Sequence, residues 1–152
     1  MKGFLEIRRI DLSVQQLLRD FFRQIVQSGD NRYFHPHPFN DETAEYIAGY
    51  SGQDLYYAIL DGERILGYGM LRGWDEGYST PSIGIIIHRD VRGINLGKTF
   101  MLFMHSAAKL RGAENVRLKV YSNNKVALKL YRKLGYVFHK GDTLQLEGVF
   151  KL

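Results

Sequence analysis

The sequence contains no cysteine, only three prolines and no long run of apolar residues. Without cysteine the chain can form no disulfide, no catalytic thiolate and no cysteine-ligated zinc site. The first residues, MKGFLEIRRIDLS, include no apolar core of signal-peptide length, and no segment approaches the length of a membrane span. We therefore expect a cytoplasmic protein that has no membrane partner and holds no metal ion.

The composition is that of an ordinary globular domain. The chain has 152 residues, of which 45% are hydrophobic and 24% charged, so we expect 1–152 to form a single domain. Lys and Arg number 21 against 16 Asp and Glu, and the formal net charge is +5. A positive field favours an anionic ligand. Because the basic residues are spread along the chain, they argue against a nucleic-acid partner.

Hydrophobic periodicity and turn residues predict an α+β domain around one mixed sheet. The expected strands are 4–10, 55–60, 64–71, 82–88, 115–121, 136–140 and 143–152. The expected helices run from Asp11 to Gly29, from an N-cap at Asp41 to Ala48, from the end of RGINLG to Gly112, and from Asn123 or Asn124 to Gly135. Gly and Asn stand where helices commonly end and begin.

The stretch HRDVRGINLGKTF, residues 88–100, joins an expected strand to an expected helix. A helix start leaves about four backbone amides without an intrahelical acceptor, and the helix dipole adds about half a positive charge there. Glycine lets the backbone approach a ligand closely, while Arg92 and Lys98 add positive charge. These features suit a phosphate-binding turn. An ordinary strand-to-helix turn explains the stretch equally well by itself, and its glycine spacing fits neither a Walker A loop nor a dinucleotide-binding fingerprint.

Two segments together resemble the GNAT (Gcn5-related) N-acetyltransferase family. RGINLG, residues 92–97, is similar to the family's Arg/Gln-x-x-Gly-x-Gly/Ala signature, with Asn95 in the fourth position. NNKVALKLYRKLGYVF, residues 123–138, resembles its Asn-x-x-Ala-x-x-Leu-Tyr-x-Lys-x-Gly-Phe/Tyr motif. The order of the expected elements agrees over essentially the whole chain. The resemblance implies a mixed sheet of about seven strands, flanked by about four helices and splayed between strands four and five.

The resemblance also implies acetyl-coenzyme A as cosubstrate, bound between the strands 82–88 and 116–121. The backbone of Ile85, Ile86 and Ile87 would hold the pantetheine arm and the thioester carbonyl. The backbone amides that would hold the pyrophosphate belong to Arg92, Gly93, Ile94, Asn95, Leu96, Gly97 and Lys98. The helix that begins at Asn124 would line the other side, and its Tyr131 would be the general acid.

Asn95 and Tyr131 each have a physical argument of their own. Asparagine is the residue that best tolerates positive φ after glycine, so the turn can survive with a side chain near the phosphates. Tyr131 lies on an apolar helical face with Ala127, Leu130 and Leu134, a pattern that alone indicates a core tyrosine. A phenol with a pKa of about 10 stays protonated at neutral pH and can donate to a departing thiolate, whose thiol has a pKa of about 8.5.

The carboxylates that the resemblance would supply as general base are absent. Ser82 stands where several members have a glutamate at the start of the fourth strand, and Lys119 stands where the ribosomal-protein enzymes have one. The remaining candidates are Asp75, Glu76, His88, His35 and His37, each of which is also an ordinary loop or turn residue. We predict no single indispensable base, with the proton passing through ordered water held by Glu76 or His88.

The loop NRYFHPHPF, residues 31–39, lies where the family builds its acceptor pocket. The expected walls of this pocket are Tyr33, Phe34, His35 and His37 on one side and Trp74, Asp75 and Glu76 on the other. The expected acceptor is a small-molecule primary amine, such as an amino sugar or an amino acid derivative. A protein N-terminal or lysine acetyltransferase and a non-catalytic acetyl-coenzyme A binding domain remain open alternatives. The apolar segment LQLEGVF, residues 144–150, could pair across a homodimer.

Overall fold

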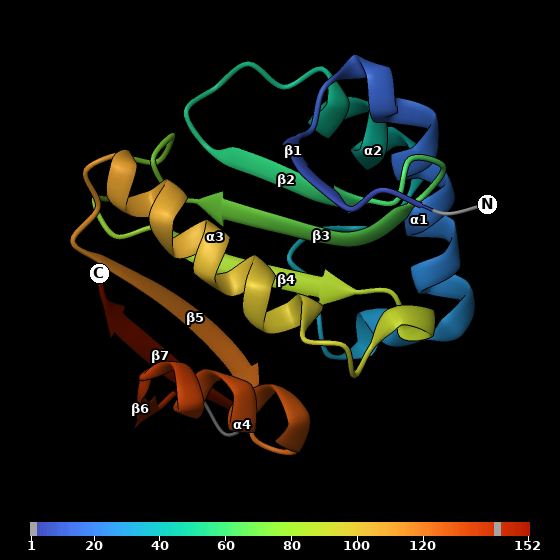
Figure 1. The fold of residues 1–152 in the computed structure, drawn as a ribbon. Helices are drawn as coiled ribbons and strands as arrows, with labels where there is room; N and C mark the ends of the chain where they lie inside the picture. Colours follow the sequence, from blue (N-terminus) through green and yellow to red (C-terminus); the bar gives the residue numbers. More distant parts are fainter. Residues whose placement is uncertain (1–2, 142–143) are drawn as a thin grey trace.

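The computed structural model describes residues 3–141 and 144–152, which form a seven-stranded sheet flanked by helices (Figure 1). The strands are β1 (Glu6–Arg9), β2 (Leu55–Leu60), β3 (Ile65–Arg72), β4 (Ser82–Ile87), β5 (Asn115–Tyr121), β6 (Val137–Lys140) and β7 (Gln145–Lys151). The α-helices are α1 (Gln15–Ser28), α2 (Asp41–Ala48), α3 (Leu96–Leu110) and α4 (Lys125–Leu134). Short 3-10 helices are η1 (Leu12–Val14), η2 (Asp30–Arg32) and η3 (Arg89–Val91). The expected α+β fold is confirmed.

The sheet is splayed between β4 and β5. Its strand order is β1-β2-β3-β4-β5-β7-β6, and β4 and β5 are its parallel neighbours. These two strands share one paired position, Ser82 opposite Arg117, and the Arg117 amide donates to the Pro81 carbonyl over 3.0 Å. Beyond this point they diverge, as Figure 1 shows. The edge of β4 that faces β5 is therefore left without a strand partner over most of its length, which confirms the predicted splay.

β4 contributes to two separate apolar cores. Its Ile86 packs with α1, α2, β2 and β3, whereas Ile85 and Ile87 pack with α3, β5 and α4. The reason is that successive side chains of a strand point to opposite faces of the sheet. β4 is thus covered on both faces, which agrees with its run of isoleucines. Within the described residues no helix is long and apolar enough to cross a membrane.

Several element ends differ from the expected ones. β1 is shorter than predicted because its partner β2 ends at Leu60, and the last backbone bond of this pair of strands joins the Phe4 amide to Asp61. The N-cap of α2 is Asn40, whose Oδ1 accepts from the Thr43 amide over 2.8 Å. Asp41 is not the cap, because its carboxylate binds Arg23 instead. Thr143, the expected start of the last strand, lies outside the described residues.

β7 is an interior strand. It pairs with β5 along one edge, from Gln145 to Lys151, and with β6 along the other. Both of its hydrogen-bonding edges are therefore occupied, so two copies of residues 144–150 cannot pair edge to edge. The expected route to a dimer is closed, and a homodimer stays a prediction.

Candidate active site

The turn between β4 and α3 presents free backbone amides. The Thr99 amide donates to the Asn95 carbonyl over 3.0 Å, which is the first bond of the helix. The amides of Leu96, Gly97 and Lys98 precede it and donate to no acceptor among the described residues. Such amides, together with the positive end of the helix dipole, attract an anion. The turn therefore has the chemistry that its sequence predicts.

Asn95 adopts the left-handed conformation, with φ of 67° and ψ of 15°. Within the described ranges it is the one non-glycine residue with positive φ. Its side chain makes no capping hydrogen bond to α3. The expectation that asparagine replaces glycine here by tolerating positive φ is thus confirmed.

Gly97 lies where β4, α3 and α4 meet. A Cβ atom at Gly97 would lie 3.4 Å from Cδ2 of Leu130, 3.9 Å from Cγ1 of Ile87 and 4.0 Å from Cδ1 of Ile85. Because Leu130 belongs to α4, this helix borders the gap that the diverging strands leave. A single methyl group fits here in ordinary contact, but a longer side chain has to extend into the space beside the free amides.

Arg92 is held by protein groups through its side chain. Its Nε donates to the Ile87 carbonyl over 3.1 Å, and its Nη2 donates to Asp30 over 3.0 Å. Asp30 also accepts from Arg89 over 2.9 Å. Burial opposes the ionisation of Asp30, but these hydrogen bonds and charges outweigh it and lower the pKa of its carboxyl group. Because its guanidinium is already bound, Arg92 is more available to an anion through its backbone amide than through its side chain.

Tyr131 is partly buried against the core that contains α3 and α4. Its ring lies 5.7 Å from the ring of Tyr136, measured between centroids. Its hydroxyl makes no hydrogen bond to another described residue, whereas that of Tyr136 lies 2.6 Å from His105 Nε2. Burial raises the pKa of Tyr131 to about 12. The phenol is therefore protonated at neutral pH and has a proton to donate.

The loop before α2 covers β4 and reaches β5. Phe34 lies over Gly84, since a Cβ atom at Gly84 would be 2.7 Å from the Phe34 ring. His35 Nε2 lies 2.6 Å from the hydroxyl of Tyr121, at the end of β5. The Tyr33 ring lies 6.1 Å from the ring of Tyr121. Three of the four residues predicted for this wall thus lie over the splayed strands.

His37, the fourth, belongs to the core under α1. Its Nδ1 donates to the Pro38 carbonyl over 2.8 Å, and its Nε2 accepts from the Tyr68 hydroxyl over 2.8 Å. Its ring packs against Phe22 and Phe39. Burial lowers the pKa of His37, so the ring is neutral. His37 therefore anchors the loop, and both of its nitrogens are occupied.

The predicted opposite wall is only partly built as expected. Asp75 accepts from the hydroxyl of Tyr50 and from the Gln53 amide, and these bonds lower the pKa of its carboxyl group. Trp74 packs with the α3 core and lies under the Arg111 guanidinium, 4.8 Å from its ring centroid. Glu76, the third residue of this wall, lines a pocket beside β4. Asp75 and Trp74 therefore stabilise the loop itself.

This pocket has a volume of 240 Å³ and lies at the start of β4. Its lining residues are Pro36, Met70, Arg72, Gly73, Glu76 and Ser82. Arg72 ends β3 directly opposite Ser82 of β4, and its Nη1 donates to the Pro36 carbonyl over 3.3 Å. The pocket thus joins the two predicted walls. Arg72 was not singled out from the sequence as a site residue. The one pattern that could have indicated it is a charged residue at the end of an apolar strand.

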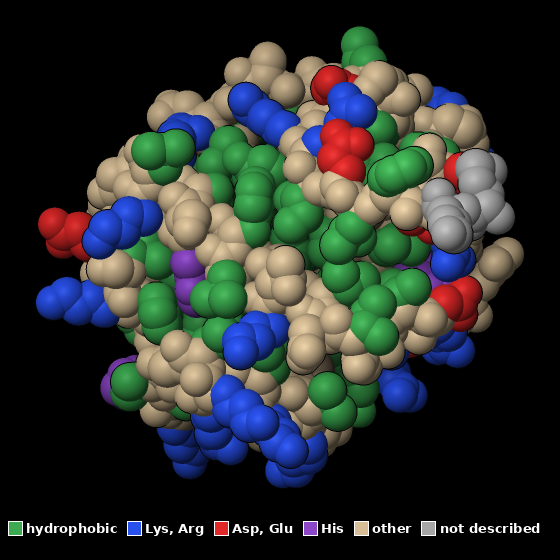
Figure 2. Space-filling model, viewed as in Figure 1, with side chains coloured by type: hydrophobic (Ala, Val, Ile, Leu, Met, Phe, Trp, Pro, Cys, Tyr) green, Lys and Arg blue, Asp and Glu red, His purple; other side chains and the backbone are tan. Residues whose placement is uncertain are grey.

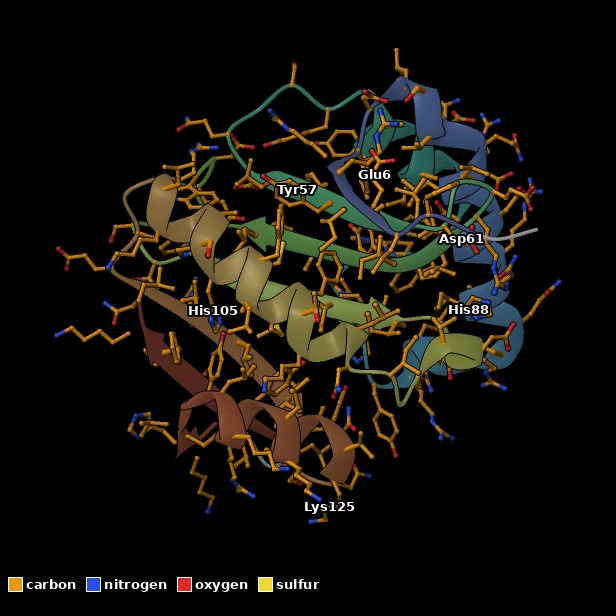
Figure 3. The ribbon with its side chains drawn as sticks, viewed as in Figure 1. Glu6, Tyr57, Asp61, His88, His105 and Lys125 are labelled. Carbon is orange, nitrogen blue, oxygen red and sulfur yellow. The ribbon has the colours of Figure 1, made fainter. Side chains whose placement is uncertain are left out.

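His88 lies at the other end of β4, beside α1 (Figure 3). It lines a separate pocket of 300 Å³ with residues of α1 and Asp30. Its Nδ1 accepts from the Asp90 amide over 3.1 Å, and its Nε2 donates to Gln24 over 2.7 Å. It stands six residues after Ser82, about 20 Å along an extended strand. The structure therefore does not bring His88 and Glu76 into one site.

Basic side chains gather over α4 (Figure 2), the helix whose Leu130 lies beside Gly97. The exposed basic residues of this helix are Lys125, Lys129, Arg132 and Lys133. Lys125 begins the helix, as Figure 3 shows. They add a positive field to that of the helix dipole and favour an anionic ligand. By contrast, no three or more His, Asp or Glu side chains in the described ranges are placed to hold a metal ion.

The splayed strand pair β4 and β5 and the free amides at the start of α3 are the features expected of a GNAT acetyltransferase. Residues 12–136 match the model of the Acetyltransferase (GNAT) family, and the chain belongs to this family. The chain is similar to the GNAT domain of PAT from S. lividans, with 16% identity over 99% of this chain and 92% of that one and a TM-score of 0.83.

Two further solved structures have the same fold. PaiA N-acetyltransferase from Thermoplasma acidophilum, in complex with coenzyme A, is 16% identical over 98% of this chain and 99% of its own, with a TM-score of 0.77. NAA60 from Arabidopsis thaliana, in complex with acetyl-CoA, is 14% identical over 98% of this chain and 99% of its own, with a TM-score of 0.72. At these identities the likeness is one of fold.

Proposed function

We propose that this protein is an N-acetyltransferase that moves the acetyl group of acetyl-coenzyme A to a primary amine of a small molecule. The observation that carries the proposal is that β4 borders both a candidate donor site and a candidate acceptor site. One of its edges is free and leads to the bare amides of Leu96, Gly97 and Lys98. Its start borders a pocket that is lined by Glu76 and Arg72. A donor and an acceptor can therefore reach the same strand.

The residues present fit acetyl-coenzyme A. The free edge of β4 from Ile85 to Ile87 offers backbone groups to the amides of a pantetheine arm. The amides of α3, the space at Gly97 and the basic side chains of α4 suit a pyrophosphate. When bound, acetyl-coenzyme A supplies the acetyl group as a reactive thioester. The similar structures of PaiA and NAA60, solved with coenzyme A and with acetyl-CoA, support this choice of donor.

A small acceptor is favoured because the loop 33–39 lies over the splayed strands and its Pro36 lines the pocket. Phe34 rests on Gly84, His35 meets Tyr121, and His37 is fixed in the core. A pocket of 240 Å³ is slightly below the range of about 300–1,000 Å³ that is usual for drug-sized ligands. A peptide chain binds along an open groove or a sheet edge, so a protein substrate would have to displace this loop.

In this mechanism Tyr131 and the pocket residues handle protons. The acceptor amine, with a pKa of about 10 if it resembles lysine, must lose a proton before it attacks. Glu76 is exposed at the pocket and can hold a water molecule that takes up this proton. Tyr131 donates its phenolic proton to the departing thiolate. The burial of Tyr131 keeps that proton in place at neutral pH.

The proposal is tested by turnover on a panel of amines with acetyl-coenzyme A, read as thiol release. The panel contains amino acids, amino sugars, peptides with free N-termini and peptides with internal lysines. Thiol release with small amines supports the proposal. Activity confined to peptides favours a protein acetyltransferase. Tight binding of acetyl-coenzyme A in calorimetry without turnover of any amine would identify a non-catalytic binding domain.

No single base is expected to be indispensable. Glu76→Gln should lower kcat/KM by less than about 10-fold, because water can still accept the proton. His88→Gln should have an equally small effect, since both nitrogens of His88 already have partners. The rate should rise with pH towards the pKa of the amine, because Tyr131 stays protonated up to a pKa of about 12. Complete loss of activity and a flat pH profile in a folded Glu76→Gln protein would make Glu76 the base.

Asn95→Gly is expected to bind acetyl-coenzyme A at least as tightly as the parent protein. Glycine adopts the φ of 67° found at Asn95 without steric cost and removes a side chain from the phosphate turn. Asn95→Ala is the matched comparison, since alanine pays about 1 kcal/mol for the same backbone. Calorimetry with acetyl-coenzyme A and denaturant unfolding measure the two effects. A large loss of affinity in Asn95→Gly would mean that the amide side chain contacts the ligand.

A further inference from the structure

Arg72 and Arg9 are the two arginines without an acidic or aromatic partner among the described residues. Six arginines form ion pairs with Asp or Glu, and four others lie over aromatic rings. Arg9, which does neither, is exposed on the edge strand β1. Arg72 is partly buried and has no carboxylate partner within the described ranges. Its polar contact is one neutral carbonyl, that of Pro36.

The Arg72 guanidinium has no counterion among the described residues. The neighbours of its guanidinium include Met70, whose sulfur lies 3.8 Å from Nη1, and Pro36. A partly buried charge without a counterion costs more than one that is paired, and a carbonyl compensates this cost only in part. Burial is the main reason for the lowered pKa of His37, and the positive charge of Arg72 lowers it further. An anion placed in the pocket would remove the cost.

The pocket offers such an anion a second polar group besides Arg72. Arg72 lines it together with Ser82, which stands opposite in the strand register and offers a hydroxyl group. A guanidinium presents parallel N–H groups that match the two oxygens of a carboxylate or a phosphate. Glu76 lies on the same pocket and forms no ion pair with Arg72 in the described residues. It can face the ammonium end of an acceptor whose acid group meets Arg72.

We propose that the acceptor amine also carries an anionic group, a carboxylate or a phosphate, and that Arg72 binds it. This inference rests on the proposed acetyltransferase function and narrows its substrate class. The anionic group would fix the acceptor at the start of β4 while the amine points along the strand. Arg72 then determines specificity, and a neutral analogue of the same amine loses its anchor.

The test uses matched pairs of amines with wild-type enzyme and acetyl-coenzyme A. Amino acids are compared with their amides, and glucosamine 6-phosphate is compared with glucosamine. We expect kcat/KM for one acidic series to exceed that of its neutral partners by about 10–100-fold. The difference should lie mostly in KM, because the neutral amine lacks the charge-assisted contact with Arg72. The carboxylate and phosphate pairs distinguish the two sources of the anion. Equal rates within both sets of pairs would overturn the proposal and leave the acetyltransferase function standing.

Variants at Arg72 locate the anion. Arg72→Gln should remove the preference for the acid, so that the acidic and neutral amines of a pair are turned over with similar kcat/KM. Arg72→Lys should keep part of the preference, because lysine retains the charge but not the parallel donors. Arg111→Gln, which removes an arginine stacked on Trp74, is the matched control and should keep the full preference. A preference that survives intact in Arg72→Gln would contradict the assignment.

A binding measurement separates the inference from the proposed function. Calorimetry is done with the N-acetylated products, N-acetyl amino acids and N-acetylglucosamine 6-phosphate. If no amine is turned over, the acetyltransferase proposal fails, but these products should still bind the wild-type protein more tightly than Arg72→Gln. Equal or absent binding to both proteins would overturn the anion site itself. Melting temperatures show that each variant is folded, and Arg72→Lys replaces Arg72→Gln if the latter is not.

Discussion

Replacing Tyr131 with phenylalanine is expected to lower kcat by about 10²–10⁴-fold, the usual range for a general acid. This fall corresponds to about 3–5 kcal/mol of activation free energy. The hydroxyl of Tyr131 has no hydrogen-bond partner among the described residues, so its removal disrupts little of the folded structure. The affinity for acetyl-coenzyme A, measured by calorimetry, should stay within a few-fold of the parent value. Steady-state thiol release gives kcat.

Tyr136 provides the matched control for this experiment. It is also a buried tyrosine near α4, with its hydroxyl 2.6 Å from Nε2 of His105. Tyr136→Phe should therefore lower stability, by about 1–3 kcal/mol for the unsatisfied His105, and leave kcat nearly unchanged. If Tyr131→Phe keeps the parent kcat, Tyr131 is a core residue like Tyr136, as its apolar helical face alone indicates.

Gly97→Asp should abolish acetyl-coenzyme A binding, with a loss of at least about 100-fold in affinity. The Cβ of the new side chain would already touch Leu130, Ile87 and Ile85, so its carboxylate must extend into the space beside the free amides. There it would occupy the anion site and repel a phosphate. An acidic side chain in the first turn of a helix is compatible with the fold, so circular dichroism should be unchanged.

Gly97→Ala is the matched control, since one methyl group meets its neighbours at 3.4 Å or more. We expect it to reduce affinity only slightly. Calorimetry on both variants separates the effect of volume from that of charge. Unchanged affinity in Gly97→Asp would show that the pyrophosphate lies elsewhere and would remove the phosphate role from this turn. Equal loss in both variants would make the site a steric one.

Local sequence patterns predicted the elements and the left-handed turn at Asn95 correctly. Helix periodicity and the stop signals at Gly29 and Gly135 depend on neighbours within one or two turns, and both glycines have positive φ. The conformation of Asn95 could be predicted for the same reason, because the φ preference of a residue is a local property. Errors at this level were small, such as the N-cap of α2 at Asn40 in place of Asp41.

The predicted pocket walls depended on longer-range contacts and were only partly right. His37 and His35 stand two residues apart in one loop, yet His37 is fixed in the core and His35 meets Tyr121 across 86 residues of chain. Similarly, Asp75 and Trp74 serve their own loop, whereas Glu76 lines the pocket. The composition of a loop indicates which groups are available. It does not indicate which face of the sheet each group will meet.

The sequence by itself determined the family resemblance, the order of the elements and the backbone conformation of the turn at Asn95. These features rest on short-range periodicity, capping and backbone preference, all of which are encoded within a few neighbouring positions. Only the tertiary structure placed Arg72 and Glu76 on one pocket without an ion pair between them, held Arg92 on Asp30 and separated His88 from that pocket. The physical reason is that charge pairing and burial depend on which strands and loops pack together, and those contacts join residues far apart in the chain.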